Sequence, residues 1–195
     1  MHEVRANQFA GILLAAGKGA RFDPSGAHNK LMHSIRNGDT VAVAAAKNML
    51  AVLPLVQAVV RPGADPLAAQ LRMCGCVVAE CPTAEAGMGA SLVSALSQVS
   101  HADGWVIALA DMPYVQPATI AALLRAIAEG ADIAVPTYGG RRGNPVAFSR
   151  MHLARLLQLS GDQGARSLLR TFVVVETAVD DPGIHRDIDT IDDLA

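Results

Sequence analysis

The sequence predicts an α/β fold in which helices cover a mostly parallel sheet. Short, continuous apolar runs alternate with helical segments along the chain, and this alternation is typical of buried parallel strands joined by helices. Apolar residues make up 51% of the chain and aromatic residues only 4%, which suits close packing of helices on a sheet. The length of 195 residues and the absence of repeats, low-complexity segments and linkers favour a single domain over residues 1–195.

The elements can be placed in order from their apolar patterns and their boundary residues. Apolar runs predict strands over 9–14, 55–60, 76–79, 105–110, 131–136 and 172–176. Helices are expected over 40–50, 65–73, 90–99, 117–128, 149–159 and 165–171. Residues 23–39 are expected to form an extended loop, and the glycine-rich stretch 137–148 a hairpin-like excursion that returns to the sheet.

Side-chain caps are expected at three helix starts, and a further strand near the end of the chain. Thr40 and Ser149 are expected to cap the starts of the predicted helices 40–50 and 149–159, and Thr190 a last turn with Asp193 at the capping-box position. Asp187 and Asp189 are expected at the end of another strand, just before this turn.

The first strand ends in a glycine-rich, cationic loop, Ala15-Ala16-Gly17-Lys18-Gly19-Ala20-Arg21. Small residues let backbone amides approach a ligand closely, and the two cations favour an anion, so the loop predicts phosphate binding. Phe22 stands where the dinucleotide fingerprint requires a small residue, and the Gly-Lys-Ser/Thr ending of the ATPase phosphate loop is missing. A tight turn that carries two cations by chance is the remaining alternative.

A carboxylate, Asp111, follows the apolar run 105–110. Ligands of such sheets bind beyond the carboxyl ends of the strands, which places the loops 15–30 and 81–89 and Asp111 on one rim. One carboxylate that faces a phosphate loop is a common way to hold magnesium. Asp187 and Asp189 are candidates for a second carboxylate, or for a helix cap and a salt-bridge partner.

The composition argues against several classes of protein. The net charge of −2 does not favour a nucleic-acid-coating protein, and the apolar run at 9–16 is too short to span a membrane. The three cysteines lack a zinc or thioredoxin spacing, so we expect buried, reduced thiols in a cytoplasmic protein. The histidines at 2, 28, 33, 101, 152 and 185 show no metal spacing, and most are expected at the surface.

Taken together, the motifs resemble those of the MobA-like nucleotidyltransferases. The resemblance rests on the loop from Leu14 to Phe22 followed by Lys30, and on five later motifs in the same order. These are Gly87-Met88-Gly89-Ala90-Ser91-Leu92, Asp111-Met112-Pro113, Arg142-Gly143-Asn144-Pro145-Val146, Gly161-Asp162-Gln163-Gly164-Ala165-Arg166 and Asp187-Ile188-Asp189-Thr190. Within this family the chain is most similar to the MocA-like molybdenum cofactor cytidylyltransferases.

The resemblance implies a Rossmann-like three-layer α/β/α sandwich, as in nucleotide-diphospho-sugar transferases, and a magnesium-dependent reaction. A terminal phosphate of molybdopterin would attack the α-phosphate of CTP and release pyrophosphate, and a molybdoenzyme or its chaperone is an implied partner. Ala15-Ala16-Gly17 goes with CTP in the family, and a second glycine in that place goes with GTP. The alternatives are a guanylyltransferase, a sugar- or polyol-phosphate nucleotidyltransferase, a non-catalytic nucleotide-binding accessory protein and a dinucleotide oxidoreductase.

The resemblance also implies roles for individual residues. The expected catalytic residues are Arg21, Lys30 and Asp111, and the expected metal ligands are Asp111 with Asp187 or Asp189. The expected nucleotide-binding residues are Leu14, Ala15, Ala16, Gly17, Gly19, Arg21, Lys30, Gly87 and Ser91. The expected acceptor-binding residues are Arg141, Arg142, Asn144 and Asp162. The gap from Arg21 to Lys30 is longer than in many relatives, and Asn144 stands where many have histidine.

Overall fold

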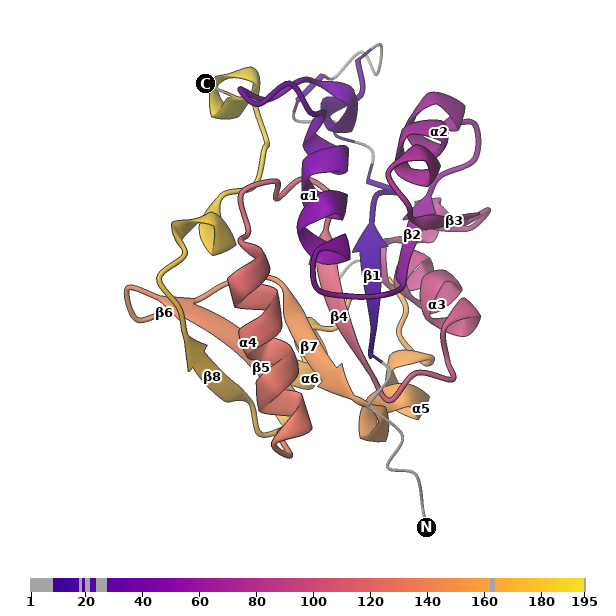
Figure 1. Cartoon of the computed structure of the whole chain (residues 1–195). Coiled ribbons are helices and arrows are strands. Elements are labelled where there is room, and N and C mark those ends of the chain that lie inside the picture. The colour runs from indigo at the N-terminus through magenta and orange to yellow at the C-terminus, as the bar shows by residue number, and fades with distance from the viewer. Residues whose placement is uncertain (1–8, 18, 20–21, 24–27, 162–163, 195) are drawn as a thin grey trace.

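A computed structural model describes residues 9–17, 19, 22–23, 28–161 and 164–194. Its centre is an eight-stranded sheet of order β3-β2-β1-β4-β7-β5-β6, in which β8 pairs with β5 (Figure 1). The strands are β1 (Phe9–Leu14), β2 (Val56–Val60), β3 (Val77–Glu80), β4 (Gly104–Leu109), β5 (Ile133–Tyr138), β6 (Arg141–Arg142), β7 (Val146–Ser149) and β8 (Val175–Ala178).

The first strand of the chain lies in the middle of the sheet. Gly11 in β1 is in register with Val56 in β2 on one side and Val106 in β4 on the other, and both pairings are parallel. The order reverses here, because the chain passes from β1 outward to β3 and then returns to place β4 on the opposite side of β1. The carboxyl ends of β1 and β4 therefore meet at the switch point where ligands bind in such sheets.

Two of the later strands are antiparallel to their neighbours. β7 lies between β4 and β5 and is antiparallel to both, and β6 folds back on β5. The stretch 137–148 is thus the predicted hairpin-like excursion. β8 restores parallel pairing on β5, so the sheet is mostly parallel, as predicted.

Helices cover both faces of the sheet and complete the predicted three layers (Figure 1). Alternate residues of β1 point to opposite faces, so Leu13 packs in one core and Ile12 in the other. The first core includes side chains of α1 (Val41–Leu50), α2 (Asp65–Met73) and α4 (Pro117–Ala128). The second includes those of α3 (Met88–Gln98), α5 (Leu153–Leu156) and α6 (Arg166–Thr171). Among the described residues, no helix has the length and apolar character needed to cross a bilayer.

Short 3₁₀ turns occupy several connections, and two of them correct the predicted elements. The turns are η1 (Lys30–Met32), η2 (Ala84–Ala86), η3 (Arg150–His152), η4 (Pro182–His185) and η5 (Ile191–Leu194). The predicted loop 23–39 therefore contains η1. Asn29 caps this turn, and its side chain accepts from the amide of Leu31 at 3.1 Å. Asp187 does not lie at the end of a strand as predicted, because η4 occupies the chain directly before it and the last strand, β8, ends at Ala178.

The predicted helix 149–159 and strand 172–176 are wrong in extent. The helix is divided into η3 and α5, whose only buried residue is Leu156, so little packing supports a longer helix. The late strand begins later, at Val175.

Two of the expected caps are absent and the third is partly present. Ser149 makes no side-chain cap, and the Thr40 hydroxyl donates to Gln70 Oε1 at 2.8 Å instead of capping α1. At the last turn, the amide and the hydroxyl of Thr190 both donate to Asp193 Oδ2. This is the carboxylate half of a capping box.

His152 is the one buried histidine among the described residues. The residue is 1% exposed, and its ring meets those of Phe148 and Phe172 edge-on. Neither ring nitrogen has a hydrogen-bond partner among the described residues. Burial lowers the pKa of His152 below its ordinary 6.5, the charge of Arg155 lowers it further and that of Asp132 opposes both. The side chain is therefore a neutral core residue.

The cysteines match the prediction of unpaired thiols. Cys76 and Cys81 are buried and Cys74 is partly exposed, and all three are free. Burial, followed by the neighbouring Cys74, raises the pKa of the Cys76 thiol to about 12. Cys76 is therefore a protonated thiol at neutral pH.

Candidate functional site

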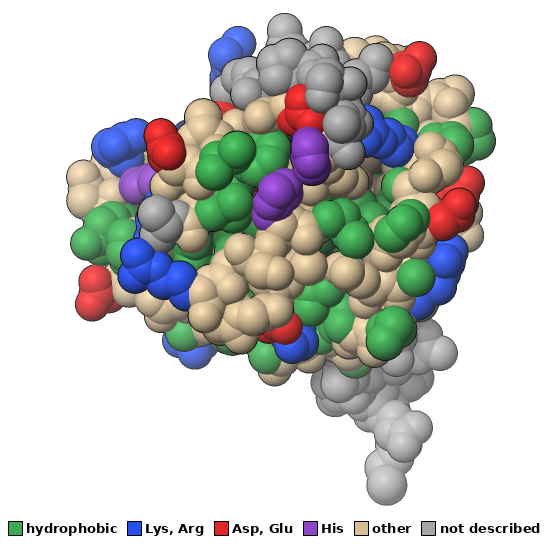
Figure 2. Space-filling view, turned by 90° about the horizontal axis from the view of Figure 1, so that it is seen from above, with side chains coloured by type: hydrophobic (Ala, Val, Ile, Leu, Met, Phe, Trp, Pro, Cys, Tyr) green, Lys and Arg blue, Asp and Glu red, His purple; other side chains and the backbone are tan. Residues whose placement is uncertain are grey.

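A cavity of about 490 Å³ opens at the carboxyl ends of β1 and β4, the upper end of the sheet in Figure 1. Seen from above, this end carries acidic, basic and histidine side chains among apolar ones (Figure 2). Four segments line the cavity: the end of β1, η1, the η2–α3 junction and the end of β4. Their lining residues are Leu14, Ala16, Gly17, Lys30, Leu31, Ala84, Glu85, Gly87, Met88, Ser91, Leu109 and Asp111.

The loop after β1 leaves the sheet at a well-held point. The Leu14 carbonyl accepts from the Ala110 amide at 3.0 Å, and the Ala15 amide donates to Val59 at 2.9 Å, so β1 is fixed on both sides up to its end. A Cβ on Gly17 would meet nothing within 4 Å, so this glycine leaves open space beside the cavity. Gly19 has a φ of +62°, a conformation that glycine adopts without strain.

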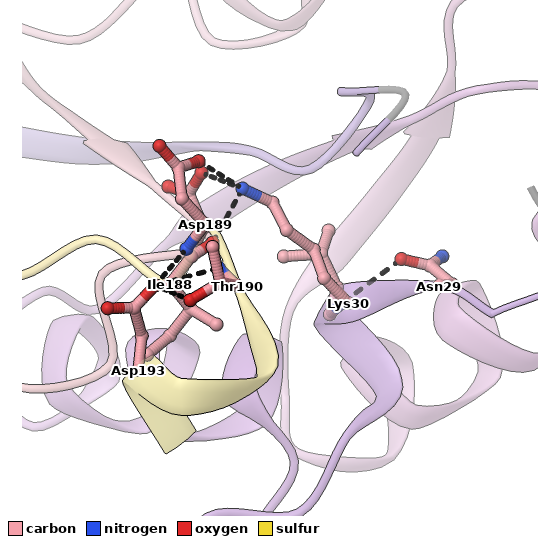
Figure 3. A network of polar contacts seen from close by, with 8 residues as sticks. Asn29, Lys30, Ile188, Asp189, Thr190 and Asp193 are labelled. Atoms are coloured by element: carbon pink, nitrogen blue, oxygen red, sulfur yellow. Dashed lines mark hydrogen bonds and ion pairs between the residues drawn. The ribbon is translucent and has the colours of Figure 1, made fainter. Parts of the chain in front are cut away.

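The side chain of Lys30 brings three oxygen atoms together at the cavity wall (Figure 3). Its ammonium nitrogen lies 2.7 Å from Asp111 Oδ2, 2.8 Å from the Ile188 carbonyl and 3.4 Å from Asp189 Oδ1. The lysine side chain is only 11% exposed. Residues far apart in the sequence therefore converge on one positive charge.

The chain at Ile188 and Asp189, which supplies two of these oxygens, is held in place by hydrogen bonds from its backbone amides. The Ile188 amide donates to the Asp111 carbonyl at 2.8 Å, which joins the C-terminal segment to the end of β4. The Asp193 carboxylate accepts from the amides of Asp189 at 3.0 Å and Thr190 at 2.7 Å (Figure 3). Hydrogen bonds from Thr190, and then from the Asp189 amide, lower the pKa of Asp193.

The donor set around Lys30 fits a divalent cation that prefers oxygen ligands. Carboxylate and carbonyl oxygens are the ligands of magnesium and manganese, and they already surround a positive charge. The second oxygen of Asp111, Oδ1, is buried and has no hydrogen-bond partner among the described residues. No group of three or more His, Cys, Asp or Glu side chains arranged for a metal occurs in the described ranges, so carboxylates from Asp111 and Asp189 would be completed by substrate phosphate and water.

The opposite wall of the cavity is the start of α3. Gly87, with a φ of +112°, precedes the helix, and Ser91 lies in its first turn with 4% of its surface exposed. The Gly89 amide donates to the Gly161 carbonyl at 2.9 Å, and a Cβ on Gly89 would lie 2.9 Å from the backbone of Ser160. This close approach ties the start of α3 to the chain that follows α5.

The structure brings together some of the residues predicted from the sequence and separates others. Those that line the cavity are Leu14, Ala16, Gly17, Lys30, Gly87, Ser91 and Asp111. Ala15 is buried beside the cavity, and Asp187 is exposed, whereas Asp189 contacts Lys30. Arg21 and Asp162 lie outside the described residues.

The described acceptor candidates, Arg141, Arg142 and Asn144, lie around the β5–β7 hairpin and do not line the cavity. Arg142 pairs with Glu176 at 2.7 Å, and both side chains are about half exposed. Arg141 is exposed, and the backbone amide of Asn144 donates to the Ile184 carbonyl at 3.1 Å. An acceptor that reached both regions would extend from the cavity to this hairpin.

Several lining groups were not anticipated from the sequence. Leu31 and Met88 adjoin predicted site residues and Leu109 lies two positions before Asp111, so proximity in the sequence was the available signal. The Ile188 carbonyl is a backbone group, and no side-chain pattern announces it.

Comparison with known proteins gives the family of this fold and site. Residues 11–179 match the family described as the MobA-like NTP transferase domain. The purine catabolism protein PucB of Bacillus subtilis strain 168 is 36% identical over 115 residues, which are 56% of this chain and 55% of PucB. The chain thus matches a little over half the length of that curated relative.

Solved structures agree with this match over almost the whole chain. Rv0371c of Mycobacterium tuberculosis H37Rv has a TM-score of 0.80 and 31% identity, with 97% of this chain and 96% of that chain covered. Its complex with manganese gives a TM-score of 0.76 at 28% identity, with 96% of each chain covered. The molybdopterin-guanine dinucleotide biosynthesis protein A of Archaeoglobus fulgidus, at 21% identity, TM-score 0.64 and coverage of 95% and 94%, shares the fold. The chain therefore belongs to the MobA-like NTP transferase family.

Proposed function

We propose that this chain transfers CMP from CTP to the terminal phosphate of molybdopterin and releases pyrophosphate, in a reaction that requires magnesium. The observation that carries the proposal is the convergence of Lys30, Asp111 and Asp189 beside the cavity that begins at the glycine-rich loop. The manganese complex of the M. tuberculosis relative supports a divalent cation in this family. The motifs shared with MocA-like enzymes support the choice of CTP and molybdopterin.

The residues of the site suit phosphoryl transfer, in which positioning and charge neutralisation dominate. Asp111 and Asp189 would hold the cation, which neutralises charge on the triphosphate when bound. Lys30 would neutralise charge at the α-phosphate, and the amides of Gly17 and Gly19 would bind phosphate oxygens. Arg21 would hold the β- and γ-phosphates. The acceptor phosphate is already ionised at neutral pH, so the reaction requires no general base.

Base selection is proposed to depend on Ala16. This residue is 8% exposed and lines the cavity between the end of β1 and the η2–α3 junction. A methyl group there narrows the space for a base, and such a contact discriminates by about 1–3 kcal/mol. The cavity volume of about 490 Å³ lies in the range of small-molecule sites.

The acceptor is proposed to extend toward the β5–β7 hairpin. Arg141, Arg142 and Asn144 are the described candidates there, and Asp162 is the candidate outside the described residues. A guanidinium such as that of Arg142 can bind a phosphate through two parallel hydrogen bonds once its exposed pair with Glu176 opens.

The test is pyrophosphate release from each of the four nucleoside triphosphates, with and without molybdopterin, in magnesium. We expect turnover with CTP and molybdopterin together and its loss in Asp111→Ala. Preference for GTP would assign the guanylyl branch, and turnover only with a sugar or polyol phosphate would refute the molybdopterin assignment. Nucleotide binding without turnover by any acceptor would indicate an accessory protein, and release unchanged in Asp111→Ala would refute the metal assignment.

A further inference from the structure

Asp181 is a buried carboxylate outside the cavity. It is 1% exposed and is the only acidic side chain among the buried described residues. Its Oδ2 accepts from the backbone amide of Gln116 at 2.8 Å and from the Thr119 hydroxyl at 2.7 Å, and its Oδ1 accepts from the backbone amide of Gly183 at 2.9 Å. A buried carboxylate is unfavourable unless hydrogen bonds satisfy it, and here three donors do so.

These contacts join the start of α4 to the C-terminal segment, which here means residues 181–189. Gln116 is the residue before α4 and makes no side-chain cap, so Asp181 supplies an acceptor and a negative charge at that helix end from 65 residues further along the chain. A Cβ on Gly183 would lie 2.8 Å from Asp181 Oδ1 and still closer to the Tyr114 carbonyl. The segment therefore packs closely against the β4–α4 connection.

From this anchor the segment runs directly to Lys30. The Ile184 carbonyl accepts from the Asn144 amide at 3.1 Å, and the side chains of Ile184 and Ile188 are buried. The Ile188 amide then donates to the Asp111 carbonyl, and the next oxygens along the chain are those that contact the Lys30 ammonium. Two of the three oxygens around Lys30 thus belong to a segment whose other end is fixed by Asp181.

We propose that Asp181 is a positioning residue for the cation–nucleotide site: its three hydrogen bonds set the place of the Ile188 carbonyl and the Asp189 carboxylate. The inference rests on the proposed function, which assigns the cation to Asp111 and Asp189. An asparagine at position 181 would keep the shape, but its amide group would face either Gly183 N–H or the donors of Gln116 and Thr119. One donor would then oppose another, and the segment would shift to relieve it.

The experiment measures manganese affinity by electron paramagnetic resonance in the full chain, with thermal unfolding of each variant. Asp181→Asn should weaken manganese binding by roughly 10–100-fold, as loss of a group that orients metal ligands does. The matched control is Arg150→Met, because Arg150 donates to the carbonyls of Ser100 at 2.8 Å and Ala102 at 2.7 Å at the opposite end of β4. It should lose stability without weakening manganese binding more than about twofold.

Thr119→Val provides a second, milder variant that keeps the carboxylate and removes one donor. It should weaken manganese binding less than Asp181→Asn does. If Asp181→Asn does not fold, the manganese affinity of Thr119→Val tests the positioning role of Asp181. Manganese affinity equal to that of the unmodified chain in the folded variant overturns the proposal, as does equal weakening in Arg150→Met.

Asp111→Asn separates this inference from the proposed function. If Asp111→Asn leaves manganese affinity unchanged, the cation site itself is wrong and both fail. If Asp111→Asn weakens binding and the Asp181 and Thr119 variants do not, only the positioning role of Asp181 is wrong.

Discussion

Replacing Lys30 with methionine should destabilise the chain most when no divalent cation is present. The ammonium makes two short hydrogen bonds, to Asp111 Oδ2 and the Ile188 carbonyl, and is 11% exposed. Bonds to charged groups contribute about 1.5–3 kcal/mol each, and solvent screens part of this, so we expect a loss of about 3 kcal/mol. For a chain of this size, that corresponds to a fall in Tm of roughly 6–12 °C.

Manganese should restore much of this loss. In Lys30→Met the oxygens of Asp111, Ile188 and Asp189 face one another without the ammonium, so a cation gains their full attraction. In the unmodified chain the ammonium competes for the same oxygens. Saturation at about 100 times Kd stabilises a folded chain by about 2.7 kcal/mol, so the rise in Tm on adding manganese should be larger in Lys30→Met than in the unmodified chain.

Differential scanning calorimetry in chelator and in manganese measures both effects. Lys47→Met is the matched control, because Lys47 pairs with Asp39 at 2.6 Å but is 54% exposed. Such a surface pair contributes about 0–1 kcal/mol, and its loss should not change the response to manganese. A Lys30→Met chain as stable as Lys47→Met, or one with the manganese response of the unmodified chain, would refute the reasoning.

Three further predictions concern His152, Cys76 and Ala16. Because the folded pKa of His152 is lowered, its contribution to stability is fully present above pH 6.5 and is lost as the pH falls through the folded pKa. His152→Leu should therefore show a smaller difference in urea unfolding between pH 7 and pH 5 than the unmodified chain. With a pKa of about 12 and a buried side chain, Cys76 should react with a thiol reagent more slowly than the partly exposed Cys74, as mass spectrometry of the native protein can show; faster labelling of Cys76 would contradict this. Ala16→Gly should raise the GTP/CTP ratio of kcat/KM by up to roughly 10–200-fold, whereas Ala15→Gly, beside the cavity, should change it less.

The central strands of the sheet were predicted better from the sequence than the short elements around them. The runs that became β1 and β4 are continuous and apolar because these strands are buried on both faces, and such runs are readable without a structure. Asp111 could be found because it ends one of these runs. The helix expected over 149–159 was wrong because short helices depend on packing, which the sequence does not display.

The site could be predicted only as far as side-chain chemistry marks it. Lys30 was found through its place in a motif, but its partner Ile188 is 158 residues away and contributes a carbonyl oxygen. The sequence did not mark His152 as the buried histidine, because its two phenylalanine neighbours come together only in the fold. Asp181 carried no pattern at all, since its role depends on donors 62 and 65 residues earlier.

The central place of β1 also has a consequence for synthesis on the ribosome. β1 is made before both of its partner strands, so one of its edges can pair with β2 while the other stays open until β4, which ends at Leu109, has been made. A nascent chain that has not yet released residue 109 therefore exposes the open edge of an apolar strand, the type of surface that recruits chaperones and aggregates.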